Sequence, residues 1–271
     1  MMQTVRGFPS PHMVREAGFS MTDVDGVGVV NPSARAQDYI GDELELFEIA
    51  TTWKAYFAKH IAGYISGDVA EVGAGLGGTT KLLCSGDETS WTALEPDTEL
   101  CKDIERKVSE GVLPNMVKPM AKTLSDLPSD QRFDSLLYID VLEHIEQDKD
   151  EIERAAAHLK PGGYLIVLAP AHQFLYTPFD RAIGHFRRYN KASLVALEPS
   201  GLELRKAFYL DSVGMLASLA NKLVLKQAQP KRSQIRFWDQ VLVPASKLFD
   251  PLTGKTLGKT VIAIWQKPKS P

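Results

Sequence analysis

The sequence contains little cysteine and no long apolar run. Its 271 residues include two cysteines, Cys84 and Cys101, which form neither a C-x-x-C pair nor a metal-binding spacing. Two isolated cysteines indicate reduced thiols in a reducing compartment, not a disulfide framework or a zinc site. No apolar run reaches about 18 residues, and the first residues lack the apolar core of a signal peptide. We therefore expect a cytoplasmic protein without a transmembrane segment.

Charge of either sign is not in large excess. The chain has 31 lysines and arginines against 34 aspartates and glutamates, which gives a net charge of −3. General nucleic-acid binders are usually strongly basic, so we expect no nucleic-acid partner. An apolar content of 44% and a charged content of 24% are ordinary for a globular protein. The length suits one large domain with added elements, as a monomer or a homodimer.

The first 66 residues divide into an arm and a helix. Residues 1–35 are rich in Gly, Pro, Ser and Asp, which predicts a loosely held arm, either disordered or folded over a ligand. From Gly41 onward, apolar residues recur every three or four positions and predict one face of an amphipathic helix, with Asp42 as its N-cap. They are Leu44, Phe47, Ala50, Trp53, Phe57 and Ile61.

Residues 67–271 predict one α/β domain, because strand and helix patterns alternate. The segment Lys160-Pro161-Gly162-Gly163 is expected to separate the third of these helices from the fifth strand. A helical insertion over residues 211–256 lies between two late strands, which are expected to extend a parallel sheet in antiparallel fashion. The expected strands are 68–72, 91–94, 115–120, 133–139, 164–169, 202–208 and 259–265, and the expected helices are 79–84, 99–108, 148–158, 191–197 and 211–225, with mixed helical character over 237–249.

A glycine-rich turn follows the first strand, in Glu71-Val72-Gly73-Ala74-Gly75-Leu76-Gly77-Gly78. Glycines permit a tight turn and let a ligand approach the backbone closely. Gly73, Gly75 and Gly78 also satisfy the dinucleotide pattern G-x-G-x-x-G. The glycines alone therefore leave two nucleoside cofactors open.

Two carboxylates bear on the choice of cofactor. Glu71 ends the first strand, where it would repel a pyrophosphate and attract a cationic amino acid moiety beside a sulfonium. Glu95 ends the second strand, 20 residues after Gly75, and can accept hydrogen bonds from ribose hydroxyls of either cofactor. The pattern favours S-adenosylmethionine. An NAD(P)-dependent oxidoreductase and a non-catalytic S-adenosylmethionine-binding protein remain as alternatives.

From about Tyr39 to Lys267 the chain resembles bacterial class I S-adenosylmethionine-dependent methyltransferases. The matching pieces are the glycine turn, Glu95, the segment from Tyr138 to Ile145 and the segment from Leu159 to Gly163. The resemblance implies a Rossmann-like sheet, mostly parallel with the last strand antiparallel and with helices on both faces. It also implies cofactor-binding roles for Glu71, Gly73, Ala74 and Gly75 at the methionine and ribose, Glu95 and Pro96 at the ribose, Thr123 and Leu124 at the adenine, and Asp140 and Val141 near the transferred methyl.

The helix with Trp53 and Tyr56 resembles a segment found in a subgroup of these enzymes that accompanies glycosyltransferases. There the helix is similar to a lid over the cofactor, which implies a cofactor contact for Trp53. The alternative is that Trp53 is a core aromatic residue. The same resemblance favours a sugar or a lipid-linked saccharide as acceptor. A hydrophobic small molecule, methylated on oxygen, nitrogen or carbon, remains open.

Methyl transfer from a sulfonium is an in-line displacement that requires no metal, and no metal-ligand cluster is evident in the sequence. A positioned base adds roughly 10²–10⁴-fold when the acceptor must lose a proton. His144, His172 and His185 are the candidate bases; the alternative for His144 is a structural role.

The segment over residues 170–190 follows the fifth strand and is rich in aromatic and basic residues. Ligands of open α/β sheets bind beyond the carboxyl ends of the strands, so we expect this loop to face the acceptor. Tyr176 and Tyr189 are expected to position the acceptor, with Tyr176 also a catalytic candidate. Arg187 and Arg188 are expected to bind a carboxylate or phosphate. The alternative is that an arginine of this segment pairs with Asp180.

The late helical segments carry apolar residues that include Met215, Phe237 and Trp238. They could roof an apolar acceptor pocket, form a dimer interface or touch a membrane surface. Packing against the sheet is the simpler expectation.

Overall fold

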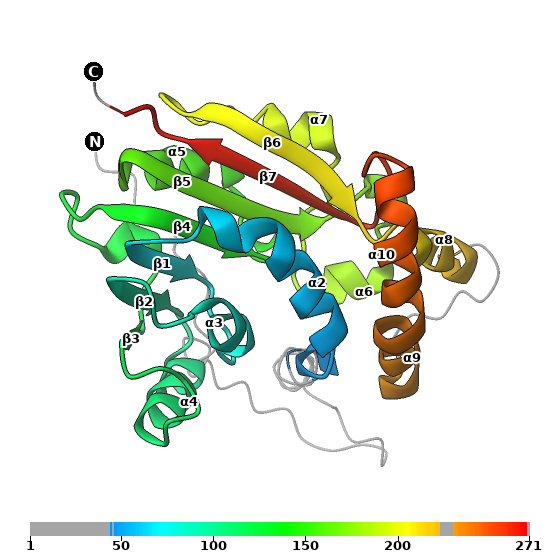
Figure 1. Ribbon diagram of the computed structural model, residues 1–271, viewed down its shortest axis with the longest axis horizontal. Helices are drawn as coiled ribbons and strands as arrows, with labels where there is room; N and C mark the ends of the chain where they lie inside the picture. Colours follow the sequence, from blue (N-terminus) through cyan, green and yellow to red (C-terminus); the bar gives the residue numbers. More distant parts are fainter. Residues whose placement is uncertain (1–43, 45, 223–229, 270–271) are drawn as a thin grey trace, which may run out of the picture.

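A computed structural model describes residue 44 and residues 46–222 and 230–269. They form one seven-stranded sheet in the order β3-β2-β1-β4-β5-β7-β6 (Figure 1). The strands are β1 (Asp68–Val72), β2 (Ser90–Leu94), β3 (Val117–Met120), β4 (Phe133–Ile139), β5 (Leu159–Pro170), β6 (Glu203–Leu210) and β7 (Thr260–Gln266).

Strands β1 to β5 pair in parallel, and β7 is antiparallel to both of its neighbours, β5 and β6. This confirms the predicted Rossmann-like sheet with its last strand antiparallel. Both late strands extend the sheet through antiparallel pairs, β5 with β7 and β7 with β6, as expected, so that β6 itself runs in the direction of β5. Burial explains the order. The first six residues of β7 are buried, whereas the first four of β6 are exposed and include charged residues, which suits an edge strand.

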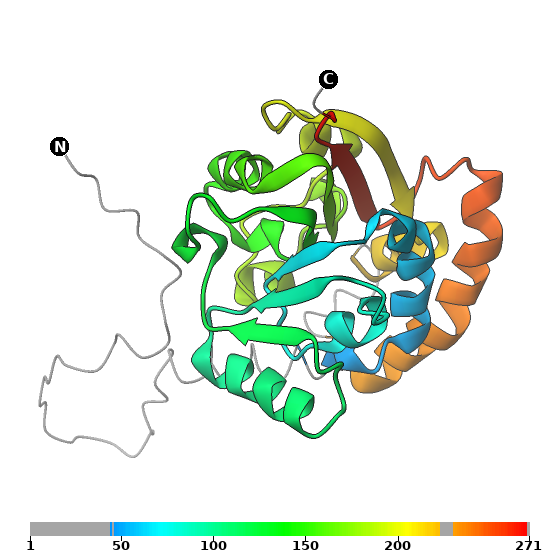
Figure 2. The same cartoon turned by 60° about the vertical axis from the view of Figure 1, so that its left-hand side comes forward.

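Helices cover both faces of the sheet (Figures 1 and 2). One core cluster joins the sheet to α2, α3, α4 and the late helices, and a second joins it to α5 and α7. The helices are α2 (Thr51–Ile61), α3 (Gly78–Leu83), α4 (Thr98–Ser109), α5 (Asp148–Ala157), α6 (Pro178–Ala182), α7 (Lys191–Val195), α8 (Ser212–Ala220), α9 (Arg232–Phe237) and α10 (Val243–Leu252). Shorter turns are η2 (Ala62–Tyr64), η3 (Leu124–Asp126), η4 (Leu142–His144), η5 (Gln173–Leu175) and the π-helical η7 (Trp238–Leu242).

The helix before β1 is shorter than its apolar pattern predicts. Helical structure breaks at Ile49 and Ala50, and α2 begins at Thr51. The carboxylate of Asp239 accepts hydrogen bonds from the backbone N–H groups of Thr52 and Trp53, at 3.2 and 2.8 Å. A residue 186 positions away therefore caps this helix, which a local pattern could not show. The predicted N-cap Asp42 and the arm over residues 1–35 lie outside the described residues.

One strand boundary also differs from expectation. Helix α5 ends at Ala157 and β5 begins at Leu159, so Lys160-Pro161-Gly162-Gly163 lies within the strand and does not separate it from the helix. The late helices α8, α9 and α10 lie between β6 and β7, as an insertion at one end of the sheet (Figure 1). Among the helices that the structure describes, none has the length and apolar character needed to cross a bilayer.

Candidate active site at the carboxyl edge of the sheet

The glycine turn joins β1 to α3 and touches the turn that follows β4. Gly73, Gly75 and Gly77 have φ angles of 70°, 55° and 75°, which side chains with a Cβ rarely adopt. A Cβ on Gly73 would lie 2.6 Å from Cγ2 of Val141. The turn is also fixed to β2, because the N–H groups of Gly73 and Ala74 donate to the carbonyl of Leu94. The ends of β1, β2 and β4 therefore meet at this point.

Glu95 lies beside the glycine turn, at the end of β2. Its carboxylate accepts hydrogen bonds from the N–H of Gly75 at 2.7 Å and from the N–H of Asp97 at 3.0 Å. Burial raises the pKa of the Glu95 carboxyl, and these two hydrogen bonds oppose that rise. Each oxygen keeps a further lone pair, so the carboxylate can still accept a hydroxyl proton. Pro96 follows it directly.

Glu71 lies inside the molecule behind the turn. It is 2% exposed, and one carboxylate oxygen accepts hydrogen bonds from the Thr80 hydroxyl at 2.6 Å and the Trp91 indole at 3.1 Å. Burial raises the pKa of the Glu71 carboxyl to about 7, while both hydrogen bonds and the charge of Lys54 lower it. Its ionisation is therefore sensitive to any cation brought to the site.

Lys54, on α2, is a site residue that sequence reasoning missed. Its Nζ lies 2.7 Å from where a Cβ of Gly78 would be, over the glycine turn. Burial lowers the pKa of Lys54, whereas the carboxylates of Glu48, Asp140 and Glu71 raise it. The only signal in the sequence was that Lys54 lies on a helix predicted to cover the cofactor.

Trp53, the neighbouring residue, is buried in a cluster of aromatic rings. Its ring centroid lies 5.8 Å from that of Trp238 and 5.6 Å from that of Phe57. The structure thus supports the core role that was the alternative to a cofactor contact.

Asp140 follows β4 with a φ angle of 54°, and its N–H donates to the carbonyl of Leu168 at 2.9 Å. Asp140 is exposed. Desolvation by the surrounding protein nevertheless raises the pKa of its carboxyl, and the charges of Lys259, Lys54 and Arg188 oppose the rise. Three basic side chains from different parts of the chain thus act electrostatically on one carboxylate.

Thr123 and Leu124, the expected adenine neighbours, begin the turn η3 after β3. The Thr123 hydroxyl donates to Asp126 at 2.7 Å, and the Thr123 N–H donates to the same oxygen at 2.8 Å. Leu124 is fully buried in the core. Only the Thr123 oxygen and the backbone of this turn remain for an adenine.

Asp180 organises the loop over residues 170–190. This buried carboxylate accepts hydrogen bonds from the Thr177 N–H at 2.8 Å, His185 Nδ1 at 3.1 Å and Arg188 Nε at 2.6 Å. Burial raises the pKa of the Asp180 carboxyl, but these partners hold it well below its usual range. The pairing of Arg188 with Asp180 is the structural role considered as an alternative for the arginines.

Three other predicted acceptor contacts have partners within the protein. Arg187 pairs with Asp148 at 2.5 Å, and the buried Tyr189 donates its hydroxyl to the same carboxylate at 2.7 Å. The Tyr176 hydroxyl donates to the His185 carbonyl at 2.7 Å. These contacts engage all three side chains and fix the loop. The expected contacts of Arg187, Tyr176 and Tyr189 with an acceptor stay predictions.

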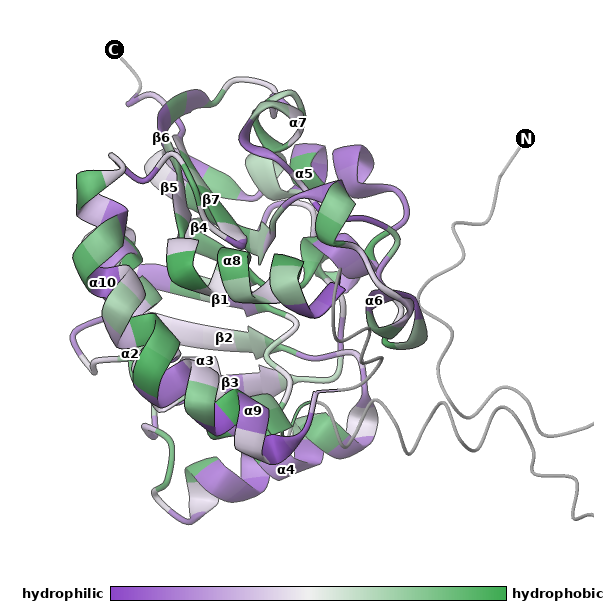
Figure 3. Cartoon of the chain, turned by 90° about the vertical axis from the view of Figure 1, so that its right-hand side faces the viewer, coloured by the Kyte–Doolittle hydropathy of each residue, from purple (hydrophilic) through white to green (hydrophobic). Residues whose placement is uncertain are grey.

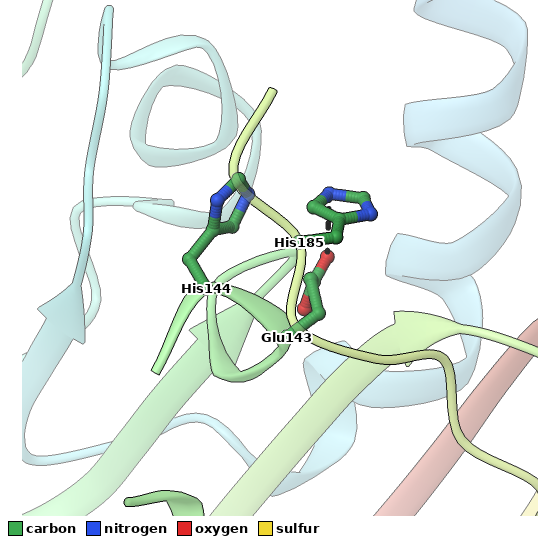
Figure 4. Close-up of side chains that lie close together, drawn as sticks. All are labelled: Glu143, His144 and His185. Carbon is green, nitrogen blue, oxygen red and sulfur yellow. Dashed lines mark ion pairs between the residues drawn. The ribbon is translucent and has the colours of Figure 1, made fainter. Parts of the chain in front are cut away.

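The structure brings two of the three predicted histidines together. The rings of His144 and His185 lie 4.5 Å apart at an interplanar angle of 84°, and His185 Nε2 lies 3.8 Å from Oε1 of Glu143 (Figure 4). Burial, with a smaller effect of His185, lowers the pKa of His144 to about 3. A base with that pKa accepts protons poorly near neutral pH.

His172 lies in a different setting, with a φ angle of 66° and its ring stacked between Phe174 and Tyr209 at 5.0 and 4.9 Å. Burial lowers the pKa of His172, while a backbone hydrogen bond with Gly258 raises it. Within the described part of the chain, its Nε2 has no hydrogen-bond partner. This arrangement leaves a neutral ring with one unengaged nitrogen.

The helical insertion adds a second cation that sequence reasoning missed. Lys259, just before β7, lies 3.7 Å from the ring centroid of Trp238 and 3.6 Å from Oδ2 of Asp211. Asp211 also accepts a hydrogen bond from the Trp238 indole at 2.6 Å. The charge of Lys259 also acts on the carboxyl of Asp140 and lowers its pKa.

Of the three apolar residues named for the late helical segments, Trp238 is 8% exposed and packs against Trp53 of α2. Phe237 is exposed, and Met215 is partly exposed. Much of the insertion has the colour of hydrophobic residues in Figure 3, and several of these residues are exposed. The exposed ones are Leu216, Phe237, Val241, Leu248, Phe249 and Leu252.

Comparison with known proteins shows one sequence family. Residues 70–165 match the model of a family described as a methyltransferase domain. This range includes the glycine turn, Glu95, Asp140 and His144. No curated protein is a detectable sequence relative.

Solved structures share the fold at low identity. Coclaurine N-methyltransferase, solved with N-methylheliamine and S-adenosylhomocysteine, has a TM-score of 0.56 and 12% identity, over 80% of this chain and 72% of that one. A Bacillus halodurans protein assigned as a methyltransferase has a TM-score of 0.54 and 15% identity, over 79% and 98%. The cyclase SpnF has a TM-score of 0.55 and 18% identity, over 79% and 81%. These likenesses establish the fold, and the cyclase shows that one fold supports different reactions.

Proposed function

We propose that this chain, an S-adenosylmethionine-dependent methyltransferase of the class I fold, transfers the methyl group to a small molecule or a glycan. The favoured acceptor is a sugar or a lipid-linked saccharide. The observation that carries this proposal is the electrostatic setting of Asp140, at the end of β4. The charges of Lys54, beside the glycine turn, and of Lys259 and Arg188 all act on its carboxyl. The two free, buried cysteines suit a reducing compartment such as the cytoplasm.

The residues around the glycine turn fit the methyl donor. Glycines with positive φ leave the backbone open to a ligand, and buried carboxylates favour a cationic one. We assign Glu95 to the ribose hydroxyls, Glu71 to the ammonium group and Lys54 to the carboxylate of the methionine moiety. S-adenosylmethionine supplies a methyl group on a sulfonium with a neutral leaving group. The remaining proposed cofactor-binding residues are Gly73, Ala74, Gly75, Pro96, Thr123, Leu124, Asp140 and Val141.

The acceptor side favours an acceptor with an anionic or strongly polar group. The charges of Lys259 and Arg188 both act on Asp140, so we assign their positive charge to the space next to the methyl position. A phosphate of a lipid-linked saccharide would be attracted there. The exposed apolar residues of α8, α9 and α10 support a lipid portion, because such a surface suits peripheral contact with a membrane.

His172 is the proposed proton acceptor. Its backbone hydrogen bond with Gly258 orients the ring, and its other nitrogen is unengaged among the described residues. That is the state a general base requires before reaction. Phe174 covers the ring, so this exposed side chain must move for the acceptor to reach Nε2.

The proposal is tested with purified chain, radiolabelled methyl donor, and soluble and lipid-linked saccharides as acceptors. We expect label transfer to a saccharide and a loss of at least about tenfold in rate for His172→Asn, with unchanged affinity for S-adenosylhomocysteine. His60→Asn, on α2, is the matched control and should keep its rate. Transfer to none of these acceptors overturns the acceptor class. A His172→Asn rate equal to that of His60→Asn overturns the assigned base.

A further inference from the structure

Three side chains with metal-ligating atoms meet beside the acceptor loop. Glu143 and His144 belong to η4, directly after β4, and His185 follows α6. One ligand atom from each lies within 4.8 Å of the others. Figure 4 shows the Glu143 carboxylate beneath the His185 ring, with one oxygen directed toward that ring, and the His144 ring beside them. Glu143 and His144 follow Asp140 by three and four residues, on the same edge of the sheet.

Hydrogen bonds hold the two segments of this cluster together. The Phe186 N–H donates to the Glu143 carbonyl at 2.8 Å, and Arg187 donates to the Glu146 carbonyl at 2.7 Å. The Tyr176 hydroxyl fixes the His185 carbonyl at 2.7 Å. The fold therefore positions the three side chains through their backbones, on both sides of the cluster.

The His185 ring is oriented by a carboxylate behind it. Asp180 Oδ1 lies 3.1 Å from Nδ1, which directs Nε2 toward Glu143. Histidines that bind metals usually donate their other ring N–H to such a carboxylate, which fixes the tautomer. The 3.8 Å between Nε2 and Glu143 Oε1 is too long for a hydrogen bond. Two atoms bound at ~2.0–2.2 Å to one cation lie ~3.0–3.5 Å apart. The His185 nitrogen and the Glu143 oxygen would therefore have to approach each other only slightly.

The set of ligand atoms suits a cation. Glu143 contributes a carboxylate whose side chain is 1% exposed, and the two histidines contribute imidazole nitrogens. We propose that Glu143, His144 and His185 bind one divalent transition-metal cation of the zinc, cobalt or iron(II) class. Two imidazole nitrogens with one carboxylate oxygen suit these ions, whereas Mg²⁺ and Ca²⁺ prefer oxygen ligands.

Three protein ligands leave a coordination position open. Because His144 and His185 are partly exposed, that position is accessible from the acceptor side. The proposal of metal binding rests only on the three ligand side chains and not on the proposed function. A role for the cation in holding an acceptor oxygen rests on the proposed function, and there it would orient the acceptor and favour loss of its proton.

The test uses the full chain, treated with chelator and titrated with Co²⁺, whose visible absorption reports nitrogen and oxygen ligation. We expect one Co²⁺ per chain, displaced by one Zn²⁺. Glu143→Gln and His144→Asn should each weaken Co²⁺ binding at least tenfold, since each removes a ligand. His60→Asn should bind Co²⁺ like the unchanged protein. Thermal unfolding of each variant without metal checks that the variant is folded. One folded ligand variant, Glu143→Gln or His144→Asn, is enough for the test.

Two outcomes overturn the inference: no binding of Co²⁺ or Zn²⁺, or equal binding by the unchanged protein and the folded Glu143→Gln and His144→Asn variants. Either would leave His185 as an ion-pair partner between Asp180 and Glu143. Titration with S-adenosylhomocysteine on the same samples separates this failure from failure of the proposed function, because that ligand needs the glycine turn and not the cluster.

Discussion

The carboxylate of Glu95 accepts a hydrogen bond from the backbone N–H of Gly75 at 2.7 Å. These two residues are 20 positions apart in the sequence, and in the fold they are in direct contact where β1 and β2 end. The contact holds the carboxylate at the rim of the glycine turn, where a nucleoside would be bound. Predictions for this edge of the sheet follow from its geometry.

Glu95→Gln should weaken binding of S-adenosylhomocysteine by about tenfold to a hundredfold. The amide keeps the shape of the side chain but loses the charged acceptor, and hydrogen bonds to charged groups contribute ~1.5–3 kcal/mol each. Isothermal titration calorimetry measures the change. Glu99→Gln, an exposed position on α4, is the control and should bind normally. Equal affinities for both variants would remove Glu95 from the ribose site.

Gly73→Ala should destabilise the fold more than Gly111→Ala. Both glycines have φ near 70°, so both substitutions bring the same backbone strain. Only at Gly73 would the new Cβ meet a neighbour, Val141, at 2.6 Å, whereas Gly111 has open space. We expect a difference of ~1–3 kcal/mol in the free energy of unfolding, measured with denaturant. Matching values would mean that the turns after β1 and β4 do not touch.

Binding of the cofactor should strengthen as pH rises toward about 7. The folded pKa of Glu71, about 7, lies above its ordinary value of 4.5, so the native carboxyl keeps a proton that the unfolded chain loses. The stability that this proton gives is present below pH 4.5 and is lost as pH rises to about 7. The ammonium group of the ligand prefers the ionised carboxylate. The affinity for the ligand therefore rises with pH while this contribution to stability falls.

Calorimetry with S-adenosylhomocysteine between pH 5.5 and 8 would show this dependence, over a range set by the ~4.5 to ~7 window. Glu71→Gln should flatten the curve, because no group remains there to titrate. A pH-dependent affinity that persists in Glu71→Gln would assign the effect to another group.

Lys54→Met should weaken binding of S-adenosylhomocysteine by roughly tenfold, since an ion pair with the ligand carboxylate is lost while the apolar stem remains. Lys59→Met, an exposed position on the same helix, is the matched control. The Lys54 variant should also bind a decarboxylated analogue as well as the unchanged protein does. A larger loss for the analogue than for the natural ligand would exclude a contact with the carboxylate.

Much of the fold follows from local sequence. β1 and β4 are short apolar runs, and turn residues separate strands from helices, so their places could be predicted within a few residues. The order of the last two strands could not be predicted with certainty from pattern alone. Both have apolar residues, and only the exposed charges of Glu203, Arg205 and Lys206 mark β6 as the edge.

The site divides in the same way. Glu71, Glu95 and Asp140 are near strand ends, and parallel strands bring their carboxyl ends to one edge, so their meeting was predictable. Lys54 could be placed only after α2 had docked, and α2 is capped by Asp239 from the distant insertion. His185 and Glu143 are 42 positions apart and meet through a loop whose path depends on Asp180.

The central claim is that the glycine turn binds S-adenosylmethionine and its product. Calorimetric titration of the purified chain with S-adenosylhomocysteine and, separately, with NAD tests this most directly. The account predicts one site with micromolar or tighter affinity for S-adenosylhomocysteine and no detectable heat with NAD. Binding of NAD alone, or no binding of S-adenosylhomocysteine, would contradict it.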